Sequence, residues 1–326
     1  MNNSSKFAIL LTFLLLPFVA SARKIAVGGI FYNASFSKNK AEVTYRGNNF
    51  FNGSYSGDVF IPEWVRFNLK TFTVTRIGEN AFFNSNSLIS VSIPKTVTSI
   101  GNGAFAFCNA LKSITLPKKV EIIDSHAFST CGALTSVIIP KSVKTIGDEP
   151  FGGCDGLATI QVEKGNKWYD SRNNCNAIIE SKTNTLIQGC KNTVIPENVT
   201  KIGYGAFSGC YSMTSINIPE SVKEIGNDAF RGCAALTSVT IPGKVMGIGS
   251  YAFCGCRSLT AISIPNSVMS IGEHAFEKCH SLTSITIPEK VTDIGEQSFL
   301  QCYALTSINI PEGVLSIGTH AFHSCI

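Results

Sequence analysis

The chain has little charge, and it has no long apolar run after its first 22 residues. Asp, Glu, Lys and Arg make up 15% of its 326 residues, whereas apolar residues make up 44%, so many side chains must be buried. The formal charge is +5, but Lys and Arg form no run. Such runs are typical of proteins that bind nucleic acids or membrane surfaces. We therefore expect no nucleic-acid ligand and no membrane insertion.

The sequence also lacks the motifs that would indicate an enzyme. It contains no Gly-rich phosphate loop, no Gly-x-Ser-x-Gly and no His-Glu-x-x-His. Three of its five histidines, His126, His274 and His320, occur before similar Ala-Phe pairs, at one position of an internal repeat. A tolerant repeat position of this kind indicates a surface location. We expect no catalytic, cofactor-binding or metal site, and hence no enzyme.

The first 22 residues differ from the rest. Lys6 precedes an apolar stretch from Phe7 to Val19, and Ala20-Ser21-Ala22 supplies the small residues that a signal peptidase reads. The alternative is a transmembrane anchor, but the stretch is shorter than the roughly 20 residues that span a bilayer. We predict a cleaved signal peptide at residues 1–22 and a secreted or cell-surface protein.

One pattern returns every 23 residues from Ile77 onward: Ile-Gly, then Ala-Phe, Cys, Leu, Ile-x-Ile-Pro and Val. In the copy that opens at Ile225, the spacing from Leu236 to Ile241 is that of a leucine-rich repeat strand. Pro242 ends this strand because proline cannot donate to a sheet. The opening Ile recurs at Ile77, Ile100, Ile123, Ile146, Ile202, Ile225, Ile248, Ile271, Ile294 and Ile317.

These copies predict a solenoid, because a single coil cannot bury its own apolar residues and must stack on its neighbours. Ala229, Phe230 and Cys233 have a helix-like spacing of three to four, which predicts a short helical turn in each coil. We expect a β-rich α/β solenoid, a right-handed leucine-rich repeat stack of 23-residue coils with one parallel sheet, short helical turns and a β-hairpin insertion.

Two coils are expanded. The last residues of successive Ile-x-Ile segments should be 23 residues apart, but Ile61 and Ile93 are 32 residues apart, and Val162 and Ile195 are 33 residues apart. The second expansion predicts a hairpin, because two apolar segments flank the turn-rich residues 181–184. We divide the chain into a signal peptide at 1–22, a β-rich N-terminal cap at 23–76, repeats at 77–162, an expanded coil with a β-hairpin at 163–201, and repeats at 202–326 with an incomplete last coil.

The repeat resembles that of the BspA-like leucine-rich repeat family, and residues 174–179 (Asn-Cys-Asn-Ala-Ile-Ile) resemble that family's variant repeat. The similarity extends from about Val59 to the end. It implies a secreted or surface protein, since members are mostly proteins of host-associated bacteria and several are adhesins. It transfers no binding residue, because the motif positions are structural.

Twelve cysteines could indicate disulfides, but nine of them occupy one repeat position between core residues. We therefore predict a ladder of buried free thiols; disulfides or a metal site are the alternatives. In the predicted hairpin, a register that places Ile178 opposite Ile187 would place Cys175 opposite Cys190, where a disulfide could close. Cys254 lies outside the ladder, and we expect its thiol to be exposed.

The outward side of the strands carries hydroxyl and amide side chains. Exposed Thr and Ser suit a strand for structural reasons alone, but such a face could also bind a ligand by many weak contacts. We predict an adhesin-like binding protein for an extracellular protein or glycan; the alternative is a structural spacer or self-assembling element. At the C-terminal end we also expect self-association, or else a continuation of the natural chain or a partner that binds there. The candidate binding residues are Thr214, Ser215, Asn217, Thr237, Ser238, Thr240, Thr260, Ser263, Thr283, Ser284, Thr286, Thr306, Ser307 and Asn309.

Overall fold

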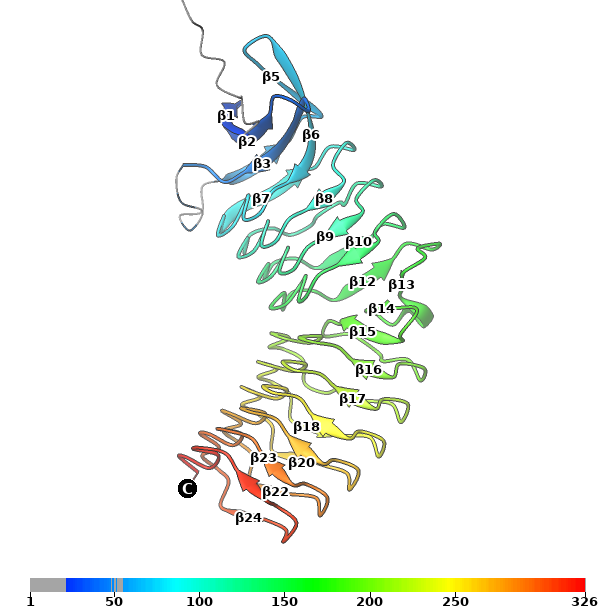
Figure 1. Ribbon diagram of the computed structural model, residues 1–326, viewed down its shortest axis with the longest axis vertical. Coiled ribbons are helices and arrows are strands. Elements are labelled where there is room, and N and C mark those ends of the chain that lie inside the picture. Colours follow the sequence, from blue (N-terminus) through cyan, green and yellow to red (C-terminus); the bar gives the residue numbers. More distant parts are fainter. Residues whose placement is uncertain (1–21, 48, 50, 52–54, 326) are drawn as a thin grey trace, which may run out of the picture.

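A computed structural model describes residues 22–47, 49, 51 and 55–325. The chain winds into a stack of coils, with β-rich N-terminal residues at one end and the last coil at the other (Figure 1). Apart from Ala22, the predicted signal peptide lies outside the described residues. In the part of the chain that the structure describes, no helix is both long and apolar enough to cross a membrane.

The N-terminal end of the stack is built from antiparallel strands that lead into the coils. Strands β1 to β3 form a meander, and β5 and β6 form a hairpin. Strand β3 pairs in parallel with β6, and β6 pairs with the first short strand of the array. The bounds are β1 (Arg23–Val27), β2 (Ile30–Ser35), β3 (Lys40–Thr44), β4 (Ser56–Phe60), β5 (Trp64–Phe67) and β6 (Lys70–Ile77).

The longest sheets run through the short extended step that opens each copy. Along each sheet the opening Ile of one copy pairs with the opening Ile of the next copy, as Ile100 does with Ile123. The first sheet ends with β8 (Ser99–Ile100), β9 (Ile122–Ile123) and β11 (Thr145–Ile146). The second contains β16 (Lys201–Ile202), β17 (Glu224–Ile225), β19 (Gly247–Ile248), β21 (Ser270–Ile271), β23 (Asp293–Ile294) and β25 (Ser316–Ile317).

The prediction of one parallel sheet is therefore wrong. The Ile-x-Ile strands, which were expected to form that sheet, join only in parallel pairs. A Pro follows most of these strands and supplies no amide donor, which limits each strand to a few residues. The pairs are β4 with β7 (Ser87–Ser92), β10 (Ser136–Ile139) with β12 (Thr159–Val162), β18 (Ser238–Thr240) with β20 (Ala261–Ser263), and β22 (Ser284–Thr286) with β24 (Ser307–Asn309).

The prediction of short helical turns is also wrong. No α-helix occurs in the described part of the chain, where Arg172–Asn174 forms a 3-10 helix, η2. In a typical turn Asp228 and Gly232 adopt φ of 55° and 73°, in the left-handed region that interrupts a right-handed helix. The Phe230 amide donates to the Ala252 carbonyl of the next coil at 2.8 Å instead of to its own turn.

The core is a stack of phenylalanine rings and a ladder of thiols. Phe230 is fully buried, and its ring centroid lies 5.1 Å from that of Phe207 and 5.2 Å from that of Phe253. The Cys256 Sγ donates to the Phe230 carbonyl at 3.3 Å, which pairs each coil with the one before it. All twelve cysteines are free thiols, as predicted for the ladder.

Glycine corners let the coils approach closely. A Cβ on Gly249 would lie 2.5 Å from the carbonyl carbon of Gly226 and 2.6 Å from the amide nitrogen of Asn227. The corresponding atom on Gly272 would lie 2.5 Å from the Ser250 nitrogen. In the Ile-Gly pair of the repeat, the Ile side chain fills the core, and the absence of a side chain on Gly leaves room for the backbone of the preceding coil.

The expanded coil contains antiparallel strands that separate two cores. Strand β13 (Tyr169–Asp170) pairs with β14 (Ile178–Glu180), and β14 pairs with β15 (Thr185–Gln188). Ile178 packs in the N-terminal core, whereas Ile179 packs in the C-terminal core. In the expanded coil, two side chains take the place of backbone carbonyls that accept hydrogen bonds between regular coils. The Tyr169 hydroxyl accepts from the Ile146 amide at 3.1 Å, and the Gln188 Oε1 accepts from the Phe151 amide at 3.2 Å.

The register in this hairpin differs from the predicted one. Ile178 lies opposite Gln188, not Ile187, because a bulge follows Ile178. No disulfide joins Cys175 to Cys190: both thiols are free, and they lie in the C-terminal and the N-terminal core, respectively. The Cys190 Sγ donates instead to the Asn176 carbonyl at 3.4 Å.

Cys254 is not an exposed thiol either. Its residue is 7% exposed and its Sγ lies 3.7 Å from the Glu277 Oε2. Cys325 is the cysteine with intermediate burial, whereas the others are buried.

We expect slow labelling of the native protein by a thiol reagent at pH 8, with Cys325 first. Only the thiolate reacts, and burial raises the pKa of Cys254 to about 11 and that of Cys302 to about 12. The thiolate fraction at pH 8 is therefore small in the folded state. Mass spectrometry of native and urea-unfolded protein would measure the difference. Fast native labelling of many ladder cysteines would contradict the buried ladder.

Candidate binding faces

The predicted binding residues lie on one exposed strand face. In β18, β20 and β22 the middle residues Val239, Ile262 and Ile285 point into the core, so the flanking side chains point outward. All fourteen candidates are exposed, and none carries a charge. The structure thus brings them together as ladders along neighbouring coils.

The hydroxyls of this face are of two kinds. Thr260 Oγ1 donates to the Thr237 carbonyl at 3.1 Å, and Thr237 Oγ1 donates to the Thr214 carbonyl at 3.3 Å. These threonines bond coil to coil and keep only acceptor capacity for a ligand. The side chains of Ser238 and Thr240, by contrast, make no hydrogen bond to any described residue. Free donors are therefore concentrated in the outward residues of the strands themselves.

Sequence reasoning missed an apolar part of the same face in the N-terminal half. Ile138 is 58% exposed at the outward position where β18 carries Thr240, and Phe60 of β4 is 71% exposed. A hollow of about 330 Å³ lies beside Ile138, lined also by Ser113, Thr115 and Glu163. The signal in the sequence was Ile138 itself, which replaces the polar residue of Ile-x-Ile.

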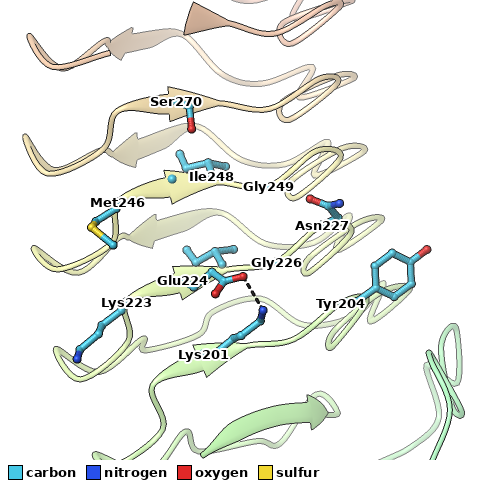
Figure 2. A pocket seen from close by; sticks show the side chains of 12 residues that line it. Lys201, Tyr204, Lys223, Glu224, Gly226, Asn227, Met246, Ile248, Gly249 and Ser270 are labelled. Carbon is cyan, nitrogen blue, oxygen red and sulfur yellow. Dashed lines mark ion pairs between the residues drawn. The ribbon is translucent and has the colours of Figure 1, made fainter. Parts of the chain in front are cut away.

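A second hollow lies on the long sheet and was also missed. It has a volume of about 530 Å³, and Figure 2 shows Met246 and Tyr204 at opposite sides of it. Its floor is open because Gly247 occupies the outward position that Glu224 and Ser270 occupy in adjacent coils.

An ion pair and Met246 give this second hollow its chemistry, and a second exposed methionine, Met269, occurs in the adjacent coil. Lys201 Nζ lies 2.6 Å from Glu224 Oε1 at one end. Met246 is 56% exposed, and the Met269 amide donates to its carbonyl at 2.9 Å, so the two thioether side chains occur in adjacent coils. Exposed methionines make adaptable protein-binding surfaces. In the sequence, the sign of this hollow was the pair Met246-Gly247 between Val245 and Ile248.

A third hollow, of about 190 Å³, lies on the turn edge where the expanded coil interrupts the array. Glu149, Tyr211 and Arg231 line it. Burial raises the pKa of Glu149, and hydrogen bonding from Ser208 and the nearby His126 oppose that rise. In the described part of the chain, no group of three or more His, Cys, Asp or Glu could hold a metal ion.

Comparisons with known proteins agree with this architecture. The family described as "BspA type Leucine rich repeat region (6 copies)" matches residues 66–180, 177–260 and 223–326. No curated protein matches the chain.

Solved structures include a leucine-rich cell surface protein of Faecalibacterium prausnitzii. It is 25% identical, with 89% of this chain and 95% of that chain covered and a TM-score of 0.62. A leucine-rich repeat protein of Eubacterium ventriosum is 23% identical, with coverage of 93% and 95% and a TM-score of 0.62. The pneumococcal vaccine antigen PcpA is 19% identical, with coverage of 92% and 86% and a TM-score of 0.61. The last two similarities concern the fold alone.

Proposed function

Because the chain belongs to the BspA-type leucine-rich repeat family, we propose that it is an extracellular or cell-surface binding protein, adhesin-like and not an enzyme. It would present its Ser/Thr-rich strand face to a protein or glycan ligand. The signal peptide at residues 1–22 and secretion are part of this proposal. The observation that supports it most is the column of exposed side chains with free hydroxyl or amide donors on strands β18 to β24.

The geometry favours many weak contacts over one pocket. The outward residues of β18 and β20 pair coil by coil, and Thr240 lies opposite Ser263, so hydroxyl groups recur there at the strand spacing of about 4.8 Å. At the other outward position Ser238 lies opposite Ala261, which interrupts the ladder. A ligand with its own repeating hydrogen-bonding groups can engage several coils at once, which raises avidity. Because the face is uncharged, its binding should depend little on salt.

The test starts from a screen of the mature protein against extracellular matrix proteins and glycans. For a ligand that binds saturably, Thr240→Arg with Thr286→Arg places two long charged side chains on the face. We expect the Kd to rise at least about tenfold, as for the loss of a central contact. Biolayer interferometry at two salt concentrations would measure it.

Asn266→Arg is a control for one added arginine, to be compared with Thr240→Arg alone, because Asn266 is exposed in the turn after Pro265 and is not one of the fourteen face residues. It should change the Kd less than about twofold. Equal effects of the control and the face variant would contradict the proposed face. Concentration-dependent oligomers with no saturable ligand would favour the structural or self-assembling alternative, for which the exposed Leu315 and Ile317 of the last coil are candidates.

A further inference from the structure

The positive charge of the protein is concentrated near its N-terminus. Residues 23–76 contain eight Lys and Arg against three Asp and Glu, a net charge of +5, whereas residues 77–326 contain 18 against 19, a net charge of −1. No run of basic residues marks this difference in the sequence. The N-terminal cap is therefore a basic unit on a nearly neutral array, and such asymmetry points to an anionic partner.

Part of this charge surrounds a hollow of about 430 Å³ between the cap and the first coils. Lys38 and Lys40 come from the turn and strand that lead from β2 into β3, and Arg76 comes from β6. Asn33 and Thr98 add amide and hydroxyl groups. The hollow thus crosses three neighbouring strands of one sheet and is open to solvent.

The single carboxylate of the hollow does not balance its three cations. Glu42 Oε2 lies 3.6 Å from Arg76 Nε, and Glu42 Oε1 accepts from Asn33 Nδ2 at 3.1 Å. Both carboxylate oxygens are thereby engaged. Among the described residues, Lys38 and Lys40 have no ion-pair partner. A net positive hollow with two unpaired ammonium groups would be stabilised by an anion, which also removes their mutual repulsion.

We propose that this hollow binds an acidic polysaccharide, with Lys38, Lys40 and Arg76 on its anionic groups and Asn33 and Thr98 on its hydroxyls. None of the described residues that line the hollow is aromatic, so it offers no platform for the stacking that single-stranded nucleic acids use. Ala22 also lines it. Cleavage of the signal peptide after Ala22 would thus create the α-ammonium group of Arg23 at its rim, which adds a positive charge.

The test uses the mature full chain and three probes: heparin, which carries sulfate and carboxylate groups, hyaluronan, which carries carboxylate alone, and neutral dextran. We expect heparin to bind and dextran not to bind. The affinity should fall roughly tenfold or more between 50 and 300 mM NaCl, because the contacts are exposed charges. Binding of hyaluronan as well would identify a carboxylate as sufficient, whereas its absence would identify sulfate as required.

Lys38→Gln with Lys40→Gln should weaken heparin binding about tenfold or more, and Lys38→Arg with Lys40→Arg should retain it. Lys244→Gln with Lys290→Gln is the matched control: both lysines are exposed in the repeats, and the total charge changes equally. Circular dichroism melts would verify that all variants fold. Thr240→Arg with Thr286→Arg should leave heparin binding intact, so this proposal and the strand-face proposal can fail separately.

Three results would overturn the proposal. The first is an equal loss of heparin binding in the control pair, which would mean attraction to net charge alone. The second is binding of dextran as tight as that of heparin. The third is a DNA duplex that binds as tightly as heparin and depends on the same two lysines, which would assign the hollow to polyanions of another class.

Discussion

Phe230→Ala should lower the free energy of unfolding by about 3–5 kcal/mol, as is usual for truncation of a buried aromatic residue. Its ring is fully buried and stacks on rings of both adjacent coils. Truncation therefore leaves a cavity that spans three coils and cannot collapse without moving their backbones. Urea denaturation followed by circular dichroism would measure the loss.

Phe322→Ala provides the comparison. Phe322 is only partly buried and stacks on Phe299 alone, at 5.4 Å. Its loss should cost less than about half as much, because part of the ring is already in contact with water. Equal losses at the two positions would be incompatible with a stack whose stability depends on neighbours on both sides.

Gly249→Ala should destabilise the protein by about 3 kcal/mol, at the upper end of the usual cost of overpacking. The added Cβ would meet backbone atoms of Gly226 and Asn227 at 2.5 and 2.6 Å. A backbone cannot rotate away as a flexible side chain can, so the two coils would have to separate. The midpoint of thermal unfolding would show the change.

Gly243→Ala, six residues earlier in the chain, is the matched control. Its nearest foreign atom would be the Glu220 Oε2 at 3.9 Å, and its φ is not in the left-handed region. We expect a change of less than about 1 kcal/mol in either direction. A similar destabilisation by both substitutions would show that loss of glycine flexibility, and not close coil contact, is responsible.

The sequence was sufficient to predict the stacking but not the conformation of the turns. Periodic Ile, Phe and Cys residues identified the core because burial imposes residue type. The spacing of Ala229, Phe230 and Cys233, however, fits a turn as well as a helix. What excludes the helix is the left-handed backbone at Asp228 and Gly232, and the same conformation occurs at Tyr251 and Gln297. Tyr and Gln do not favour that region, but Gly, Asn, Asp and His do, and they occupy the Asp228 position in most copies. The residue types at this position were therefore a signal against a helix that the spacing argument overlooked.

The pairing of strands was predicted less well, because hydrogen bonds between coils depend on geometry that a single coil does not contain. The Ile-x-Ile segment looks like the better strand, yet the two-residue step through Ile248 forms the longer sheet. In the hairpin, one bulge after Ile178 moved its partner from Ile187 to Gln188. Cys175 and Cys190, expected opposite one another, are both free thiols. The right-handed winding of the stack stays a prediction.

For the candidate sites, alternation along the strand predicted which side chains are exposed but not which keep a free donor. The Thr237 hydroxyl looks like that of Thr240 in the sequence, but only the first donates to the preceding coil. The hollows arise from small or exceptional residues, such as Gly247, whose effect depends on neighbours 23 residues away. Such effects become visible only when the coils are placed side by side.

The thiol ladder also bears on the order in which the cysteines become buried during synthesis. Eight of the nine ladder thiols donate to a carbonyl 26 residues earlier, as Cys279 does to Phe253; Cys210, which follows the expanded coil, is the exception among the described ladder cysteines. A newly added coil therefore completes its sulfur contact on structure that already exists. A polypeptide that emerges N-terminus first can therefore sequester its cysteines in order of synthesis. Refolding from a fully unfolded chain lacks this order and would leave many thiolates open to oxidants at once.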